Sequence, residues 1–230
     1  MDFLERTDCP FCSSSLVEKT EKSFHRNKHA NVKWCKSSIY KCKECFGMFA
    51  NRVPTKEGFI SSYSSYAEQN YGLKRFVKAF PKKKNFDKNE RVLEVGGGNK
   101  GISEICKFYK SVEINSAGHY KMTFDDLSDD DFAKLEKESF QSIVTCDCIE
   151  HVLFPRSFFR NAHRILKKGD KMYMHFGEIH SKGKIDNLKE IQFLHINIPT
   201  HLSVVEMSKK YFEIEVGSPH SNPGYVFVRK

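Results

Sequence analysis

Two pairs of cysteines near the N-terminus have the spacing of a metal site. Cys9 and Cys12 enclose two residues, and so do Cys42 and Cys45. Such spacing allows both sulfurs of a pair to reach one tetrahedral zinc ion at about 2.3 Å. Five of the eight cysteines fall within the first 45 residues, and no secretion signal precedes them, so we expect bound metal rather than disulfide bonds. The two pairs are predicted to hold a structural Zn²⁺. Further candidate ligands between them are His25, His29 and Cys35.

A glycine-rich turn follows the apolar residues 91–95. Gly96, Gly97 and Gly98 come directly after this stretch, and Gly101 follows three positions later. Glycine permits a sharp turn from a strand into a helix and lets a ligand approach the backbone where a Cβ would collide. Since Gly96, Gly98 and Gly101 also fit the G-x-G-x-x-G pattern, a nicotinamide- or flavin-binding enzyme remains an alternative.

The elements that must position this turn alternate between strand and helix. We expect strands at residues 91–95, 111–114, 141–146 and 171–176, and helices at residues 102–108 and 155–166. This alternation predicts an α/β, Rossmann-like fold with a mainly parallel sheet. Glu113 lies at the end of the second expected strand, nineteen residues after Glu94, where a carboxylate can bind ribose hydroxyls or can be an ordinary strand-end residue.

Two segments resemble class I S-adenosylmethionine-dependent methyltransferases. Residues 92–99 are similar to the first motif of that family, and residues 140–152 with 155–170 are similar to its fourth strand and following helix. The resemblance implies S-adenosylmethionine as cofactor, with Glu94 anchoring its amino group through water. The implied cofactor-binding residues are Glu94, Gly96, Gly97, Gly98, Glu113, Asp125, Asp126 and Cys146.

Some of these assignments have a plain structural alternative. Asp125 and Asp126 sit where family members contact the adenine amino group, but they could instead begin a helix, where carboxylates suit the helix dipole. The loop after the fourth strand borders the methyl-transfer centre in the family, which makes Asp147, Glu150 and His151 candidates. Glu150 and His151 could equally cap and pack the next helix.

A base is needed if the acceptor is a hydroxyl or an acidic carbon. His151 is the first choice, with His175 and His180 behind it, and the predicted catalytic set is His151, Asp147 and His175. Other titratable residues expected to rim the pocket are Glu178, His195 and His201.

Positive charge is concentrated in the N-terminal part of the chain. The formal charge is +9, and residues 1–90 hold 18 Lys and Arg against 10 Asp and Glu, while residues 91–230 hold 20 against 19. We expect a zinc-ribbon-like module at 1–53, a helical connector at 54–88 and a methyltransferase domain at 89–230. An N-terminus without a secretory pattern and a chain without a long apolar run predict a cytoplasmic protein outside the membrane.

The expected activity is O- or N-methylation of a small-molecule or carbohydrate acceptor. The order of modules, Tyr63-x-x-Tyr66 and residues 193–197 also look like methyltransferases of bacterial sugar and surface-polysaccharide pathways. The basic N-terminal part keeps an RNA or DNA methyltransferase as an alternative. A non-catalytic zinc-ribbon interaction protein is the third. The sequence leaves the oligomeric state open.

Overall fold

The computed structural model describes most of the chain. The described residues are 3–24, 37–64, 72–83, 85–98, 101–114, 118–176, 190–191, 195–217 and 224–230. Several predicted ligands and bases lie outside them: His25, His29, Cys35, Glu178 and His180.

A seven-stranded sheet forms the centre of the protein. Its strand order is β14-β15-β11-β10-β7-β8-β9, and every neighbouring pair is parallel except those that β15 makes with β11 and β14. The strands are β7 (Arg91–Val95), β8 (Phe108–Glu113), β9 (Tyr120–Lys121), β10 (Ser142–Cys146), β11 (Lys171–His175), β14 (Phe212–Gly217) and β15 (Gly224–Arg229). This sheet confirms the predicted α/β, Rossmann-like, mainly parallel architecture.

Five α-helices and two 3₁₀ turns accompany the strands in the described part of the chain. They are α1 (Lys56–Ser64), α2 (Gly72–Ala79), η1 (Ser103–Ile105), α3 (Asp129–Glu136), η2 (Ile149–His151), α4 (Pro155–Ile165) and α5 (His201–Ser208). The helix expected at 155–166 is confirmed. Pro155 stands in its first turn, and Phe158, Phe159 and Ala162 on one side of it are buried. No helix of the described residues is long and apolar enough to cross a bilayer.

The helix expected at residues 102–108 is wrong. Only η1 forms there, and β8 already begins at Phe108, three residues before the expected strand. The glycine turn uses the first part of the connection between β7 and β8. Because the backbone N–H of Ile102 donates to the buried Glu94 carboxylate and Cys106 returns to extended backbone, only one helical turn fits between them.

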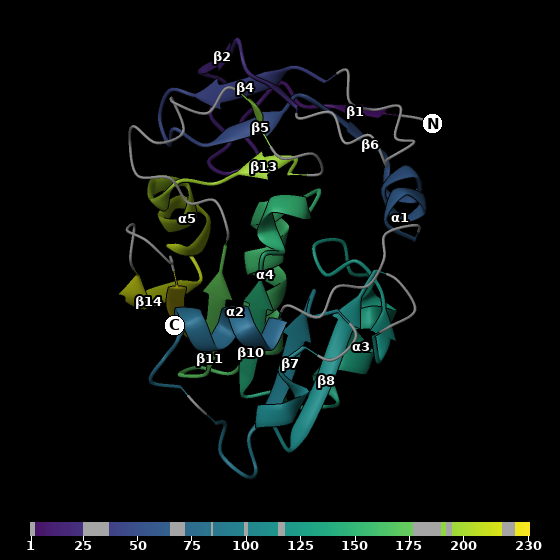
Figure 1. Ribbon diagram of the computed structural model, residues 1–230, viewed down its shortest axis with the longest axis vertical. Coiled ribbons are helices and arrows are strands. Elements are labelled where there is room, and N and C mark those ends of the chain that lie inside the picture. The colour runs from purple at the N-terminus through teal and green to yellow at the C-terminus, as the bar shows by residue number, and fades with distance from the viewer. Residues whose placement is uncertain are drawn as a thin grey trace.

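Small sheets lie against one end of the central sheet (Figure 1). A four-stranded sheet has the order β13-β5-β4-β2, and two further pairs are β1-β6 and β12-β3. Their strands are β1 (Phe3–Glu5), β2 (Val17–Lys19), β3 (Ser23–Phe24), β4 (Ile39–Cys42), β5 (Met48–Ala50), β6 (Arg52–Pro54), β12 (Glu190–Ile191) and β13 (Asn197–Ile198). β12 and β13 come from the C-terminal part of the chain, so distant segments complete the N-terminal module.

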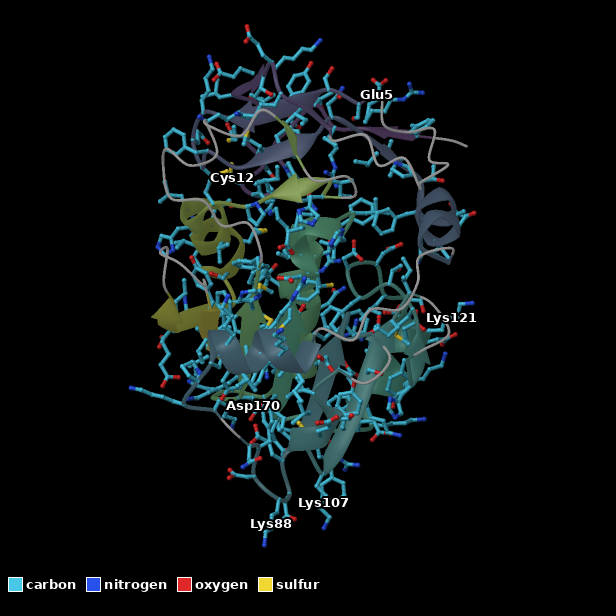
Figure 2. All side chains as sticks on the ribbon, viewed as in Figure 1. Glu5, Cys12, Lys88, Lys107, Lys121 and Asp170 are labelled. Atoms are coloured by element: carbon cyan, nitrogen blue, oxygen red, sulfur yellow. The ribbon has the colours of Figure 1, made fainter. Side chains whose placement is uncertain are left out.

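The N-terminal module covers the carboxyl ends of the parallel strands. In Figure 1 the arrow of β11 points toward the small sheets. Figure 2 places Lys88, Lys107 and Asp170, which precede β7, β8 and β11, at the opposite end of the molecule from Cys12. Since open α/β sheets bind their ligands at the carboxyl ends of the strands, the module lies beside the expected site.

A half-buried arginine fixes the module to this edge. The guanidinium of Arg6 donates to the carbonyl of Leu153 at 2.5 Å and to Oδ1 of Asn197 at 3.0 Å. Leu153 lies in the loop between η2 and α4, and Asn197 begins β13. Burial lowers the pKa of Arg6 to about 10, which leaves the side chain cationic at neutral pH. The loop after β10 is therefore held directly by the N-terminal module.

Candidate functional site

The four predicted metal ligands converge on one point. The sulfurs of Cys9 and Cys45 are 3.5 Å apart, those of Cys12 and Cys42 are 3.6 Å apart, and all four lie within 4.8 Å of one another. A tetrahedral zinc ion with Zn–S bonds of about 2.3 Å requires sulfurs separated by roughly 3.8 Å. The arrangement therefore fits zinc and confirms the zinc-ribbon-like module.

The glycine turn has the backbone that only glycine adopts easily. Gly96, Gly98 and Gly101 have φ of 77°, 72° and 46°. A Cβ on Gly101 would lie 1.7 Å from Oε2 of Glu94, and one on Gly97 would lie 2.2 Å from Cδ of the same residue. The turn thus wraps tightly over the Glu94 carboxyl group, and any side chain at Gly97 or Gly101 would displace it.

Glu94 supports the turn from below. Its side chain is fully buried, and Oε2 accepts hydrogen bonds from the backbone N–H of Ile102 at 2.9 Å and from the Tyr109 hydroxyl at 2.8 Å. Among the described residues, Oε1 has no hydrogen-bond partner. Burial raises the pKa of this carboxyl group. The contacts give Glu94 a role in shaping the turn, and Oε1 stays available for the predicted water-mediated contact.

Glu113 lies next to the glycine turn, as the predicted ribose site requires. It ends β8, is largely buried, and its Oε1 accepts a hydrogen bond from the backbone N–H of Gly98 at 2.9 Å. The parallel pairing of β7 with β8 brings the two features together, because adjacent parallel strands end at the same edge. The turn on one side and the Glu113 carboxylate on the other thus form a cradle at this edge of the sheet.

Asp125 and Asp126 face different surroundings. Asp125 is buried, and its Oδ2 accepts the backbone N–H of Phe154 at 2.8 Å, while the half-exposed Asp126 pairs with Lys56 at 3.0 Å. The alternative that they begin a helix is wrong, because α3 begins at Asp129 with Ser128 as its cap. Asp125 instead ties the end of β9 to the loop that leads into α4.

A charged cluster occupies the carboxyl end of β10. Asp147 has a positive φ of 49°, pairs with Arg75 of α2, and places Oδ1 3.0 Å from Nδ1 of His175. Burial is the main cause that lowers the pKa of His175, so this ring is neutral at neutral pH. The predicted residues Asp147 and His175 therefore meet at the ends of adjacent strands.

The remaining candidates lie around the same edge. Cys146 is buried at the end of β10, and the half-buried His151 ends η2 with its ring 4.7 Å from that of His195, edge to face. Sequence reasoning missed Arg75 and Cys148. A Cβ on Gly96 would lie 2.9 Å from the Cys148 sulfur, so Cys148 packs against the turn. Arg75 lies outside the motifs, and the motif at residues 140–152 does not single out Cys148, since the contacts of both residues arise through tertiary packing.

The sheet order, the glycine turn after its central strand and the strand-end carboxylate define a Rossmann-like methyltransferase fold. The sequence pattern of the methyltransferase domain family matches residues 65–206, and the chain belongs to that family. The family membership implies S-adenosylmethionine as the methyl donor, which removes nicotinamide and flavin enzymes as alternatives.

The chain is similar to solved structures of low sequence identity. The PH0226 protein from Pyrococcus horikoshii is 19% identical with a TM-score of 0.50, and the match covers 73% of this chain and 95% of that chain. A possible histamine N-methyltransferase from Thermotoga maritima is 17% identical with a TM-score of 0.49, with coverage of 70% and 90%. No curated protein sequence matches the chain significantly.

Proposed function

We propose that the protein transfers a methyl group from S-adenosylmethionine to an oxygen or nitrogen atom of a small-molecule or carbohydrate acceptor. The observation that carries this proposal is the hydrogen bond between Gly98 N–H and Glu113 Oε1, which joins the turn and the carboxylate in one cradle. The family supports the donor, and the fold provides a site at the carboxyl edge of the sheet.

Different residues of the cradle are proposed to bind different parts of S-adenosylmethionine. Glu113 accepts hydrogen bonds from the ribose hydroxyls, and the backbone of Gly96, Gly97 and Gly98 lies against the methionine part. Asp125 and Asp126 are the candidates for contacts with the adenine. Cys146, at the end of β10, is proposed to form the bottom of the cofactor site. When bound, the cofactor supplies an electrophilic methyl group on a sulfonium. The protein then has to align the acceptor with that group and exclude water.

Replacing Glu113 by alanine tests the cradle. The affinity for S-adenosylmethionine, measured by isothermal titration of zinc-loaded protein, is expected to fall about 100-fold, because hydrogen bonds to a charged group contribute about 1.5–3 kcal/mol each. Glu104→Ala is the matched control, since this carboxylate is exposed on η1. Wild-type protein that binds no S-adenosylmethionine would contradict the proposed function. Equal affinities of the two variants would contradict the role of Glu113.

His151 is proposed as the base, and Asp147, which pairs with Arg75, is proposed to position the ring of His175. His151→Gln is expected to lower the rate of label transfer from S-adenosylmethionine about 100-fold or more while leaving donor affinity unchanged, because it removes only the proton acceptor. Mass spectrometry of cell extract incubated with the protein and labelled donor measures this rate and identifies the product. If His175→Gln causes the loss and His151→Gln does not, His175 is the base instead.

A further inference from the structure

A groove lies between α4 and α5, and none of its lining residues belongs to the cradle. Its volume is about 310 Å³, and its lining residues are Arg156, Ser157, Arg160, Glu206, Met207, Lys210 and Tyr211. Arg156 and Arg160 stand one turn apart in the first half of α4, whereas the other side comes from the end of α5 and the residues after it. Three cationic side chains therefore line one small space.

These three cations contact only neutral groups in the described part of the chain. Arg156 donates to the hydroxyl of Ser13, Nε of Arg160 lies 3.5 Å from the amide oxygen of Asn161, and the Lys210 ammonium lies 5.5 Å from the centre of the Tyr211 ring. The carboxylate that lines the groove, Glu206, is paired with Lys209 at 2.5 Å. Within the described residues, no carboxylate thus pairs with Arg156, Arg160 or Lys210.

The next arginine on the same helix shows the contrast. Arg164 pairs with Glu136 at 3.0 Å and with Asp129 at 3.5 Å. Along α4, the arginine at the end thus has carboxylate partners, and the two at the beginning have none among the residues that the structure describes. An unneutralised group of cations converging on a concave surface favours an anionic ligand, and arginine favours phosphate in particular.

The groove begins at the first turn of α4, the helix that follows the loop carrying His151. α4 begins at Pro155, and His151 ends η2 only a few residues earlier. On the other side, Arg156 contacts Ser13, which directly follows the zinc ligand Cys12. A phosphate held here would belong to a molecule that can extend toward His151.

The surroundings favour a small ligand over a nucleic acid. Residues 91–230 hold 20 Lys and Arg against 19 Asp and Glu, so the domain that carries the groove is nearly neutral. Carboxylates such as Asp129, Glu136 and Glu206 flank the groove helices and would repel a long polyanion. A volume of about 310 Å³ is at the small end of the range for ligand sites.

We infer that the groove between α4 and α5 binds a phosphate group of the methyl acceptor. The acceptor is then a phosphorylated small molecule, such as a sugar linked to a nucleoside diphosphate. Arg156, Arg160 and Lys210 hold the phosphate oxygens, and the Tyr211 ring offers an apolar surface beside them. The inference rests on the proposed function, because only a methyltransferase has a methyl acceptor. Phosphate binding to the groove can nevertheless be measured without methyl transfer.

Titration with inorganic pyrophosphate tests the groove in the full-length, zinc-loaded protein. The Kd of the double variant Arg160→Gln, Lys210→Gln is expected to rise about tenfold or more above that of the wild type, because two charged hydrogen-bond donors are lost. The control double variant Lys88→Gln, Lys107→Gln removes the same charge outside the groove lining, at the end of the molecule opposite to Cys12 (Figure 2), and is expected to bind as the wild type does.

Other results of these titrations would contradict the inference. Absence of pyrophosphate binding by the wild type, or an equal loss in both double variants, would overturn the inference. A single-stranded oligonucleotide of about ten residues serves as a second probe. If it binds more tightly than pyrophosphate and only the groove variant loses it, the ligand is a nucleic acid and the inference is wrong. Titration of the same samples with S-adenosylmethionine separately tests the proposed function.

Discussion

Replacement of Cys42 by serine is expected to unfold the N-terminal module and to abolish stoichiometric zinc binding. Cys42 is fully buried at the end of β4, and its sulfur lies 3.6 Å from that of Cys12. The free energy of unfolding should fall by about 5 kcal/mol or more, because structural zinc contributes roughly 10–16 kcal/mol of apparent binding energy to modules of this kind. Metal content by atomic emission and the midpoint of urea unfolding measure the two effects.

Cys106→Ser is the control for this experiment. Cys106 is also buried, but it follows η1 in the catalytic domain, away from the four-cysteine cluster. It is expected to retain full zinc occupancy and to lose only the stability that one buried polar substitution costs, about 1–3 kcal/mol. Full zinc occupancy and an unchanged midpoint in Cys42→Ser would show that the cluster is no zinc site.

Gly101→Ala is expected to abolish measurable binding of S-adenosylmethionine. The added methyl group would occupy the position of Glu94 Oε2, which holds the Ile102 N–H and the Tyr109 hydroxyl. The turn would have to move away from Glu94, and the cradle next to Glu113 would lose its shape. A fall in affinity of about 1,000-fold corresponds to roughly 4 kcal/mol, which is within the range for a steric conflict in a closely packed region.

Gly169→Ala separates this steric effect from backbone strain. Gly169 also has a positive φ, 86°, but a Cβ there would meet no atom within 4 Å. Strain alone costs about 1–2 kcal/mol, and the residue lies at the amino end of β11, so donor affinity should be unchanged. If both variants bind the donor as the wild type does, the turn does not form the cofactor site.

The parts of the site that were predictable lie close together in sequence. The spacing of Cys9 and Cys12 fixes two sulfurs within one turn of the chain. Similarly, the glycine turn follows its own strand directly, and Glu113 ends the next strand. For these residues the local sequence pattern is enough to predict the final geometry. Few other folds of the same short segments agree with their spacing and residue types.

The features that escaped prediction depend on distant contacts. The hydrogen bond from Arg6 to Leu153 joins residues 147 positions apart, and the pairing of Arg75 with Asp147 needs α2 to pack over β10. The helix expected after Gly101 failed for the same reason. Phe108 already pairs with Arg91 where β8 begins, which ends the helical turn, and hydrophobic periodicity does not report this pairing.

The strand β13 has a consequence for the order of folding during synthesis. It pairs with β5 of the N-terminal sheet, and Arg6 reaches Asn197 across 191 positions of sequence. While the chain is still being translated, the zinc cluster can form from the first 45 residues, but the β5 edge has no partner until residue 198 has left the ribosome. Nascent chains shorter than this expose an unpaired edge strand, which favours aggregation.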